Sequence, residues 1–316
     1  MCRLSFGAFA LFALVLIAFG TQPPVAHGQL LTQHVKGSVG LKSGSQPPPG
    51  GYIPLIFYRY TTDEVKDRNG RTLPGDADLT SVFYGVGYSQ VFSRTILGGF
   101  YGFSVLFPAG ANNRIQGTEI DQNPGAGLTD SVFTPITLGW HHTRADFLAG
   151  LNIYAPTGRY TNGANDNTGL GMWGFEPAFG TTVYFDGAKR YHAATQVTFD
   201  MQTNKEDSDT HVGNQINVEG GAGGDFLKGG LSTGLVYYAA YKVSDDTIEG
   251  LPGILIRGRN KVFAIGPEAT LAIALHDKVY GFVTVRYFWE LYARTATQGS
   301  ALLIQGTLLT RPITVP

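Results

Sequence analysis

Apolar and polar side chains alternate along much of the chain. In residues 191–201 the odd-numbered positions are mostly apolar, whereas the even-numbered positions include His192 and Asp200. Residues 279–291 repeat this pattern, with Glu290 on the polar parity. Side chains in a β-strand point alternately to opposite faces, so each segment predicts a strand with one apolar and one polar face.

Twelve such strands are predicted, and their connections differ in length. We predict strands near residues 51–61, 79–92, 95–107, 131–142, 144–155, 171–185, 188–202, 212–226, 229–242, 260–275, 278–294 and 300–310. Every second connection is short: 93–94, 143, 186–187, 227–228 and 276–277. The others are mostly long and polar: 62–78, 108–130, 156–170, 204–211 and 243–259, with a shorter one at 295–299.

Short turns at one end and long loops at the other are typical of outer-membrane β-barrels. A soluble β-sandwich would also alternate, but it has no reason to sort its loops in this way. The predicted fold is therefore an all-β transmembrane antiparallel barrel of about twelve strands, with short periplasmic turns and long extracellular loops. An even strand count puts both ends of the barrel on the periplasmic side.

The N-terminus indicates export. Arg3 precedes an apolar stretch over residues 4–19, and residues 26–28 (AHG) offer small side chains for cleavage. We interpret residues 1–28 as a signal peptide. After it, no run of about 18 apolar residues follows, which excludes helical membrane spans and leaves a closed barrel over residues 51–316. The expected location is the cell outer membrane.

Composition narrows the chemistry. The one cysteine, Cys2, lies in the predicted signal peptide, so disulfides and thiol chemistry are not expected. With 15% charged residues and a net charge of −1, the chain has no cluster of basic residues suited to binding nucleic acid. Residues 46–51 (QPPPGG) cannot pair in a sheet, because proline lacks the N–H donor. Residues 29–50 are either a periplasmic lead-in, which we favour, or a small plug folded into the lumen.

Ordered motifs carry a resemblance to a known family. They lie at 125–130 (GAGLTD), 138–140 (LGW), 155–160 (APTGRY), 170–175 (LGMWGF), 237–246 (YYAAYKVSDD) and 265–268 (IGPE), with a weaker match at 40–44 (GLKSG) and 47–50 (PPPG). Their order and spacing resemble the outer-membrane proteins labelled "putative meta-pathway of phenol degradation". The resemblance implies passage of hydrophobic or aromatic compounds across the outer membrane. The C-terminus departs from common outer-membrane barrels, because it lacks a terminal aromatic residue.

Strand parity predicts which charged and polar side chains face the lumen. The candidate pore-lining residues are Arg59, Asp146, Glu176, His192, Gln196, Asp200, Glu219, Glu268, Arg286 and Glu290. They could form a hydrogen-bonded network that fills the barrel, or a lining that selects solutes. Catalysis by an acid pair is a third reading, but the sequence supplies neither the separation nor the pocket that it needs.

The favoured function is passive uptake of small hydrophobic, including aromatic, compounds through an outer-membrane channel. A lipid-modifying enzyme and a structural or surface-interaction barrel are the alternatives. We expect no enzymatic activity, no catalytic residues, no metal and no cofactor. The expected partners are the lipid and lipopolysaccharide of the outer membrane and the small hydrophobic solute.

Overall fold

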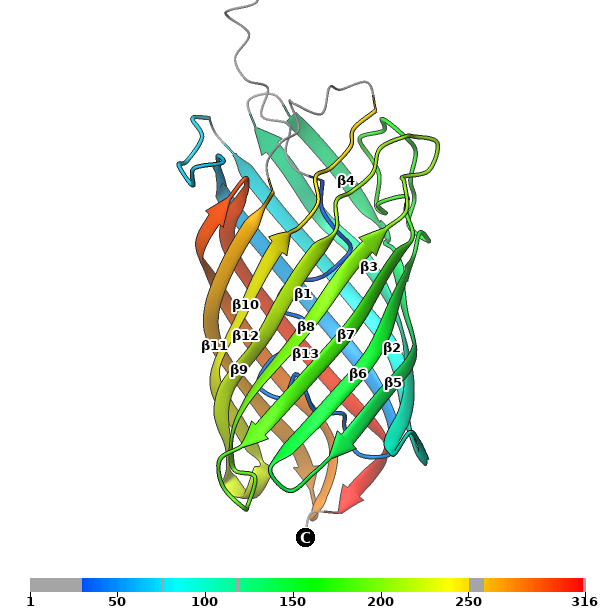
Figure 1. Cartoon of the computed structure of the whole chain (residues 1–316), viewed down its shortest axis with the longest axis vertical. Helices are drawn as coiled ribbons and strands as arrows, with labels where there is room; N and C mark the ends of the chain where they lie inside the picture. Colours follow the sequence, from blue (N-terminus) through cyan, green and yellow to red (C-terminus); the bar gives the residue numbers. More distant parts are fainter. Residues whose placement is uncertain (1–29, 76, 118–119, 250–258, 315–316) are drawn as a thin grey trace, which may run out of the picture.

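The computed structural model describes residues 30–314, except 76, 118–119 and 250–258, so the expected signal peptide lies outside the described residues. Antiparallel strands make up almost all of its regular structure (Figure 1). Their bounds are β1 (Gly50–Lys66), β2 (Asp78–Ile96), β3 (Gly99–Gly117), β4 (Ile120–Leu128), β5 (Ser131–His141), β6 (Ala145–Ala155), β7 (Gly174–Tyr184), β8 (Tyr191–Gln202), β9 (Gln215–Phe226), β10 (Leu231–Lys242), β11 (Lys261–Leu275), β12 (Lys278–Arg294) and β13 (Ala296–Thr314). Among the described residues, no helix is long and apolar enough to cross a membrane.

The sheet closes on itself. β1 pairs with β2 on one side and with β13 on the other, so the first and last strands meet. β4 and β5 both pair with β3, in succession along the same edge, and together they occupy one strand position. The barrel thus has twelve positions, which confirms the predicted fold class and strand count. The closing strand β13 pairs with both β1 and β12.

The connection expected as a loop at 108–130 is largely a hairpin. β3 continues through Pro108 to Gly117, and β4 returns beside it at the extracellular end of the barrel (Figure 1). Pro108 lies opposite Gly85 of β2. The sequence pattern missed this hairpin because strands that extend beyond a membrane need no alternation between lipid and lumen.

Two shorter connections also differ from the prediction. The first tight turn lies at Leu97 and Gly98, which both have positive φ, rather than at 93–94. Two-residue hairpin turns favour glycine because they need such backbone angles, and Gly98 meets this need. Only Thr295 separates β12 from β13, where a loop at 295–299 was expected.

The strands have distinct inner and outer faces. Along β8 burial alternates without interruption, and the even-numbered residues from His192 to Gln202 are buried inside the barrel. Large apolar side chains point outward, and Phe179 is 66% exposed. Such an outward apolar surface suits contact with lipid.

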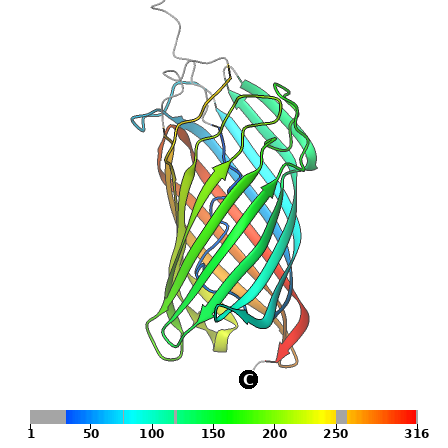
Figure 2. The same ribbon diagram turned by 45° about the vertical axis from the view of Figure 1, so that its right-hand side comes forward.

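Residues 30–49 run through the interior of the barrel (the blue trace in Figures 1 and 2). At one end, the backbone N–H of Leu30 donates to Asp246, which follows β10. At the other, Ser45 donates to Asp146, beside the tight turn that precedes β6. We call residues 30–49 the luminal segment. Its contacts are those of a plug, so the favoured reading as a periplasmic lead-in was wrong. Prolines cannot pair in a sheet, but they can still lie inside the barrel that the sheet forms.

Candidate functional site: the barrel lumen

The inner wall is acidic, and the luminal segment is basic. Six predicted lumen acids are buried, each 5% exposed or less: Asp146, Glu176, Asp200, Glu219, Glu268 and Glu290. Arg286 is the basic wall residue among the predicted set that is buried with them. The segment brings His34, Lys36 and Lys42, and each of them pairs with a wall carboxylate. The chain therefore supplies its own counter-charges to the lumen.

His34 lies at the centre of the most buried cluster. Its Nδ1 is 2.6 Å from Glu176 and its Nε2 is 3.0 Å from Glu219. All three side chains are 4% exposed or less. Although burial opposes charging of the ring, the two carboxylates raise the pKa of His34 well above its usual value. The protonated imidazolium then donates one hydrogen bond to each carboxylate.

Backbone groups strengthen the same cluster. The N–H of Gly37 donates to Glu219 at 2.6 Å, and the N–H of Val39 donates to it at 3.2 Å. On the wall, Asn152 donates to Glu176 at 2.7 Å. Glu219 thus holds three successive parts of the segment, and its removal would leave several buried donors without a partner.

Asp200 completes a group that has the composition of a metal site. His34, Glu176 and Asp200 each place a potential ligand atom within 4.8 Å of the others. Both nitrogens of His34 already contact carboxylates, however, and the amide of Asn217 donates to Asp200 at 3.1 Å. Hydrogen bonds and one ion-paired imidazole account for the arrangement, so we assign it as a clamp on the segment.

Lys36 forms a second ion pair, with Glu290 at 3.0 Å; the side chain of Glu290 is fully buried and that of Lys36 is 22% exposed. Glu290 also accepts hydrogen bonds from Tyr60 at 2.7 Å, from Tyr238 at 2.8 Å and from the N–H of Gly299 at 2.7 Å. The ammonium lies 5.5 Å from the centroid of the Tyr60 ring and 5.7 Å from that of Tyr238. Such a cation–π contact adds to the ion pair.

An apolar cluster fills the interior beside these charges. Its described members come from the segment, β1 and β10–β13: Leu41, Tyr58, Tyr60, Val236, Tyr238, Val262, Ala264, Phe288, Ala293, Ala301 and Leu303. Leu41 lies against the glycine-rich wall, and a Cβ on Gly223 would be 3.0 Å from its Cδ2. Glycine at this position therefore leaves room for the segment.

Arg286 and Glu268 join the segment to the wall near Leu41. Their side chains are 2.5 Å apart, and Arg286 also donates to the carbonyl of Ser38 at 3.0 Å. The N–H of Leu41 donates to Glu268 at 3.3 Å. The wall pair thus contacts the backbone of the segment at both Ser38 and Leu41.

Near the short turns, the ion pair of Lys42 is more open to solvent, whereas Asp146 is buried. Lys42 pairs with Asp225 at 2.6 Å, with side-chain exposures of 43% and 23%. Asp146 accepts from Ser45 at 2.8 Å and from Tyr184 at 2.6 Å. The segment is thus held along its length, but its most buried ion pairs lie at the level of His34 and Lys36.

Nine of the ten predicted pore-lining residues are buried on the inner face. Arg59 is the exception, because it is exposed on the outer face between two buried neighbours, Tyr58 and Tyr60. His192 is fully buried beside the ring of Tyr184, and Gln196 lies opposite Glu219 on β9. The prediction of Arg59 as a lumen residue was wrong, because parity in β1 was assigned with the charge inward.

Sequence reasoning missed the residues of the luminal segment that contact the wall. His34, Lys36 and Lys42 lie in a short stretch without strand alternation, and parity arguments give no placement there. One signal was present. The predicted inner wall carried many more acids than bases, and these three basic residues were the nearest supply of opposite charge.

The fold and the charged, segment-filled interior define an outer-membrane β-barrel protein. The family described as "Putative MetA-pathway of phenol degradation" matches residues 62–305. The chain belongs to this family, as the ordered motifs indicated. No curated protein matches the chain.

One solved structure supports the fold. The chain is similar to the COG4313 outer membrane channel from Pseudomonas putida F1, with a TM-score of 0.71 and 14% identity, over 86% of this chain and 100% of that one. The β domain of the Bordetella autotransporter BrkA has a TM-score of 0.43 at 12% identity, over 83% and 99% of the two chains. The TodX monoaromatic hydrocarbon channel mutant has a TM-score of 0.39 at 10% identity, over 85% and 91%. The first likeness concerns the fold, and the other two are too distant to carry an argument.

Proposed function

We propose that this protein is a passive outer-membrane channel for small hydrophobic compounds, including aromatic ones, and that it is not an enzyme. The observation that carries the proposal is the composition of the interior. Aromatic and aliphatic side chains, among them Tyr58, Tyr238 and Phe288, pack inside the barrel. Beside them lie ion pairs between the luminal segment and the barrel wall. Such a lumen suits a narrow path for apolar solutes better than a wide water-filled pore.

The luminal segment is the gate in this proposal. It contacts the wall from Asp246 near the long loops to Asp146 near the short turns. A solute that enters the lumen has to displace part of the segment or pass beside it. Leu41 and its apolar neighbours offer such a solute a surface without charge. Family membership and the similarity of the fold to that of the COG4313 channel also support the proposed channel function.

Uptake by cells tests the function. Cells that produce the protein should take up toluene and phenol faster than cells without it, whereas uptake of a sugar should be unchanged. The variant Phe288→Ala should alter toluene uptake, because Phe288 is fully buried in the apolar cluster. Equal uptake with and without the protein would refute the channel.

A variant of a lumen acid separates the alternatives. Glu268→Gln should abolish lipid hydrolysis if the barrel is a lipid-modifying enzyme, and it should change uptake if the lumen is a solute path. A surface-interaction barrel would show neither effect. Lipid hydrolysis by the wild-type protein that is lost in Glu268→Gln would contradict the proposal.

A further inference from the structure

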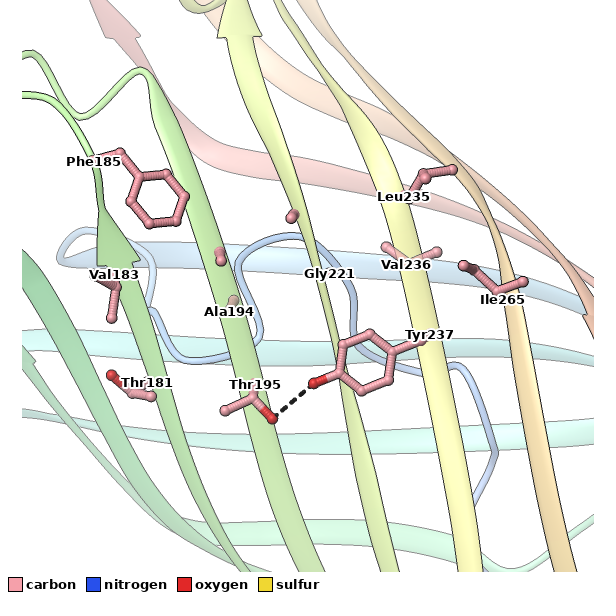
Figure 3. A pocket seen from close by; sticks show the side chains of 12 residues that line it. Thr181, Val183, Phe185, Ala194, Thr195, Gly221, Leu235, Val236, Tyr237 and Ile265 are labelled. Carbon is pink, nitrogen blue, oxygen red and sulfur yellow. Dashed lines mark hydrogen bonds between the residues drawn. The ribbon is translucent and has the colours of Figure 1, made fainter.

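The outer face of the barrel carries a groove of about 570 Å³ over strands β7 to β11 (Figure 3). Its floor is formed by small side chains. Ala193 of β8 lies opposite Ala222 of β9, and Thr195 lies opposite Gly220. These positions have the outward parity of β8 and β9, and the luminal segment passes behind the strands in Figure 3. The groove therefore opens away from the lumen.

Larger side chains form the two walls of the groove. Val183 and Phe185 stand on the β7 side and are 42% and 63% exposed. Leu235 stands on the β10 side and is 59% exposed. Figure 3 shows these walls on either side of the small residues. The exposed apolar walls and the low floor make a trough in a surface that otherwise presents large side chains to lipid.

A tyrosine of β10 borders one end of the groove. At one end Tyr237 reaches across β9, opposite Gly220, and its hydroxyl donates to Thr195 at 3.0 Å. Toward the short turns, beyond the lining residues, the rings of Tyr191 on β8 and Phe226 on β9 meet edge to face, with centroids 6.4 Å apart. The groove therefore lies close to the short turns, in the half of the barrel that faces the periplasmic leaflet.

Exposed basic side chains surround this end. Arg144, Arg190 and Lys228 lie on three successive short turns, and each is exposed. Arg144 donates to the carbonyl of Phe185, a wall residue of the groove, at 3.2 Å. The guanidinium of Arg190 lies 6.0 Å from the centroid of the Tyr191 ring. Positive charge thus adjoins the apolar trough.

The acids of the same turns have partners of their own. Asp146 lies 3.2 Å from Lys189, and Asp225 pairs with Lys42 at 2.6 Å. Asp186 accepts a hydrogen bond from the N–H of Tyr191 at 3.0 Å. The basic residues at the lower end of the groove are consequently available to an anionic group from outside the chain.

We propose that this groove binds one acyl chain of a phospholipid in the periplasmic leaflet, with the phosphate of the same lipid at Arg190 and Arg144. The volume lies within the roughly 300–1,000 Å³ of ligand sites. Arginine suits phosphate because its planar donors match two oxygens. The Tyr237 hydroxyl donates to Thr195, which lowers the cost of placing an apolar chain beside these two side chains.

Photo-crosslinking with a phospholipid tests the site. The full-length protein is reconstituted in vesicles of phosphatidylethanolamine and phosphatidylglycerol that contain a trace of phospholipid with a diazirine on one acyl chain. Mass spectrometry then maps the labelled residues. We expect labelling concentrated at Val183, Ala222 and Leu235. Labelling spread evenly around the outward faces of all the strands would overturn the proposal.

Two pairs of variants give the controls. Ala222→Phe should reduce labelling of the groove about tenfold, because the ring occupies its volume, whereas Ala269→Phe, an outward alanine on β11, should leave it unchanged. If Ala222→Phe does not fold, as judged by the heat-dependent migration of the barrel, Ala193→Leu replaces it. Unchanged labelling in the folded groove variant would contradict the proposal.

The charged end is tested separately. Arg190→Gln should reduce groove labelling about fivefold, whereas Lys278→Gln, at a more distant short turn, should not. A diazirine-bearing alkane without a headgroup distinguishes a free hydrocarbon from the lipid. If the alkane labels the groove as strongly as the phospholipid and Arg190→Gln has no effect, the groove holds a hydrocarbon solute and the lipid assignment fails.

Discussion

The luminal segment is held by similar contacts in two regions with different surroundings. We call residues 34–39 its centre, and residues 42–45 form its end near the short turns. Lys36 and Lys42 each form one ion pair with a wall carboxylate. The side chains of Lys36 and Glu290 are 22% and 0% exposed, whereas those of Lys42 and Asp225 are 43% and 23% exposed. Charges that are removed from water depend on their partners, and charges in contact with water do not.

This difference indicates where the segment is fastened. At the centre, loss of one partner leaves a buried charge or several buried donors unpaired, as at Glu219. At the Lys42 pair, near the short turns, water replaces a lost partner at little cost. Contacts that look alike by distance should thus differ strongly in their effect on stability and on closure of the lumen.

Glu219→Ala should have the largest effect. It removes the acceptor for His34, Gly37 and Val39 together, so we expect the free energy of unfolding to fall by about 3–5 kcal/mol. Urea unfolding in lipid vesicles, followed by tryptophan fluorescence, measures it. Glu219→Gln keeps the shape of the side chain and one acceptor oxygen, so its free energy of unfolding should fall by less than that of Glu219→Ala. Equal stability of Glu219→Ala and wild type would contradict a clamp at the centre.

Lys36→Met should have the second-largest effect on the free energy of unfolding. Glu290 would keep its hydrogen bonds from Tyr60, Tyr238 and Gly299, so we expect a loss of about 2–3 kcal/mol rather than the full cost of an isolated charge. The same unfolding measurement applies. Tyr60→Phe is a useful second variant, because it removes one of these donors and should make the effect of Lys36→Met larger.

Alkaline pH should loosen the segment at His34. Its pKa is raised in the folded protein, so its contribution to stability is complete below about 6.5, the value of free histidine, and is lost as pH rises through the higher folded value. The groups around it are Glu176, Glu219, Asp200 and Tyr154. Hydrogen exchange of the segment should quicken above neutral pH in the wild type. A pH response that persists unchanged in His34→Gln would exclude this histidine as its origin.

Lys42→Met should have the smallest effect, and it is the matched comparison for Lys36→Met. Exposed ion pairs contribute about 0–1 kcal/mol, so the free energy of unfolding should change by less than about 1 kcal/mol. If Lys42→Met destabilised the barrel as much as Lys36→Met, burial would not distinguish the two ends of the segment.

Much of the barrel could be predicted from the sequence because a strand between lipid and lumen imposes a strict alternation. Asp146, Glu176 and Asp200 could be placed inward in this way, since each interrupts an apolar strand on one parity. The hairpin of β3 and β4 could not, because its extension beyond Pro108 carries no such pattern. Arg59 shows the limit of the rule, since a charged residue can also face outward.

The luminal segment could not be placed by pattern, because its conformation is set by contacts distant in sequence. His34 finds Glu176 and Glu219 only after β7 and β9 have brought their inner faces together. The prolines at residues 47–49 predicted that residues 46–51 would not pair in the sheet. This is correct for residues 46–49 and wrong for Gly50 and Gly51, which begin β1 and pair with β2. The prolines left open whether the segment would lie inside or outside the barrel, and the excess of wall acids was the available indication.

Single-channel conductance in planar bilayers tests most directly whether the centre of the luminal segment closes the barrel. The wild-type protein should conduct small ions weakly, because the segment crosses the lumen and is clamped at His34 and Lys36. The double variant Glu219→Ala/Lys36→Met should show a much larger and more variable conductance, whereas Lys42→Met should match the wild type. A wild-type conductance as large as that of the double variant would contradict closure by the clamped segment.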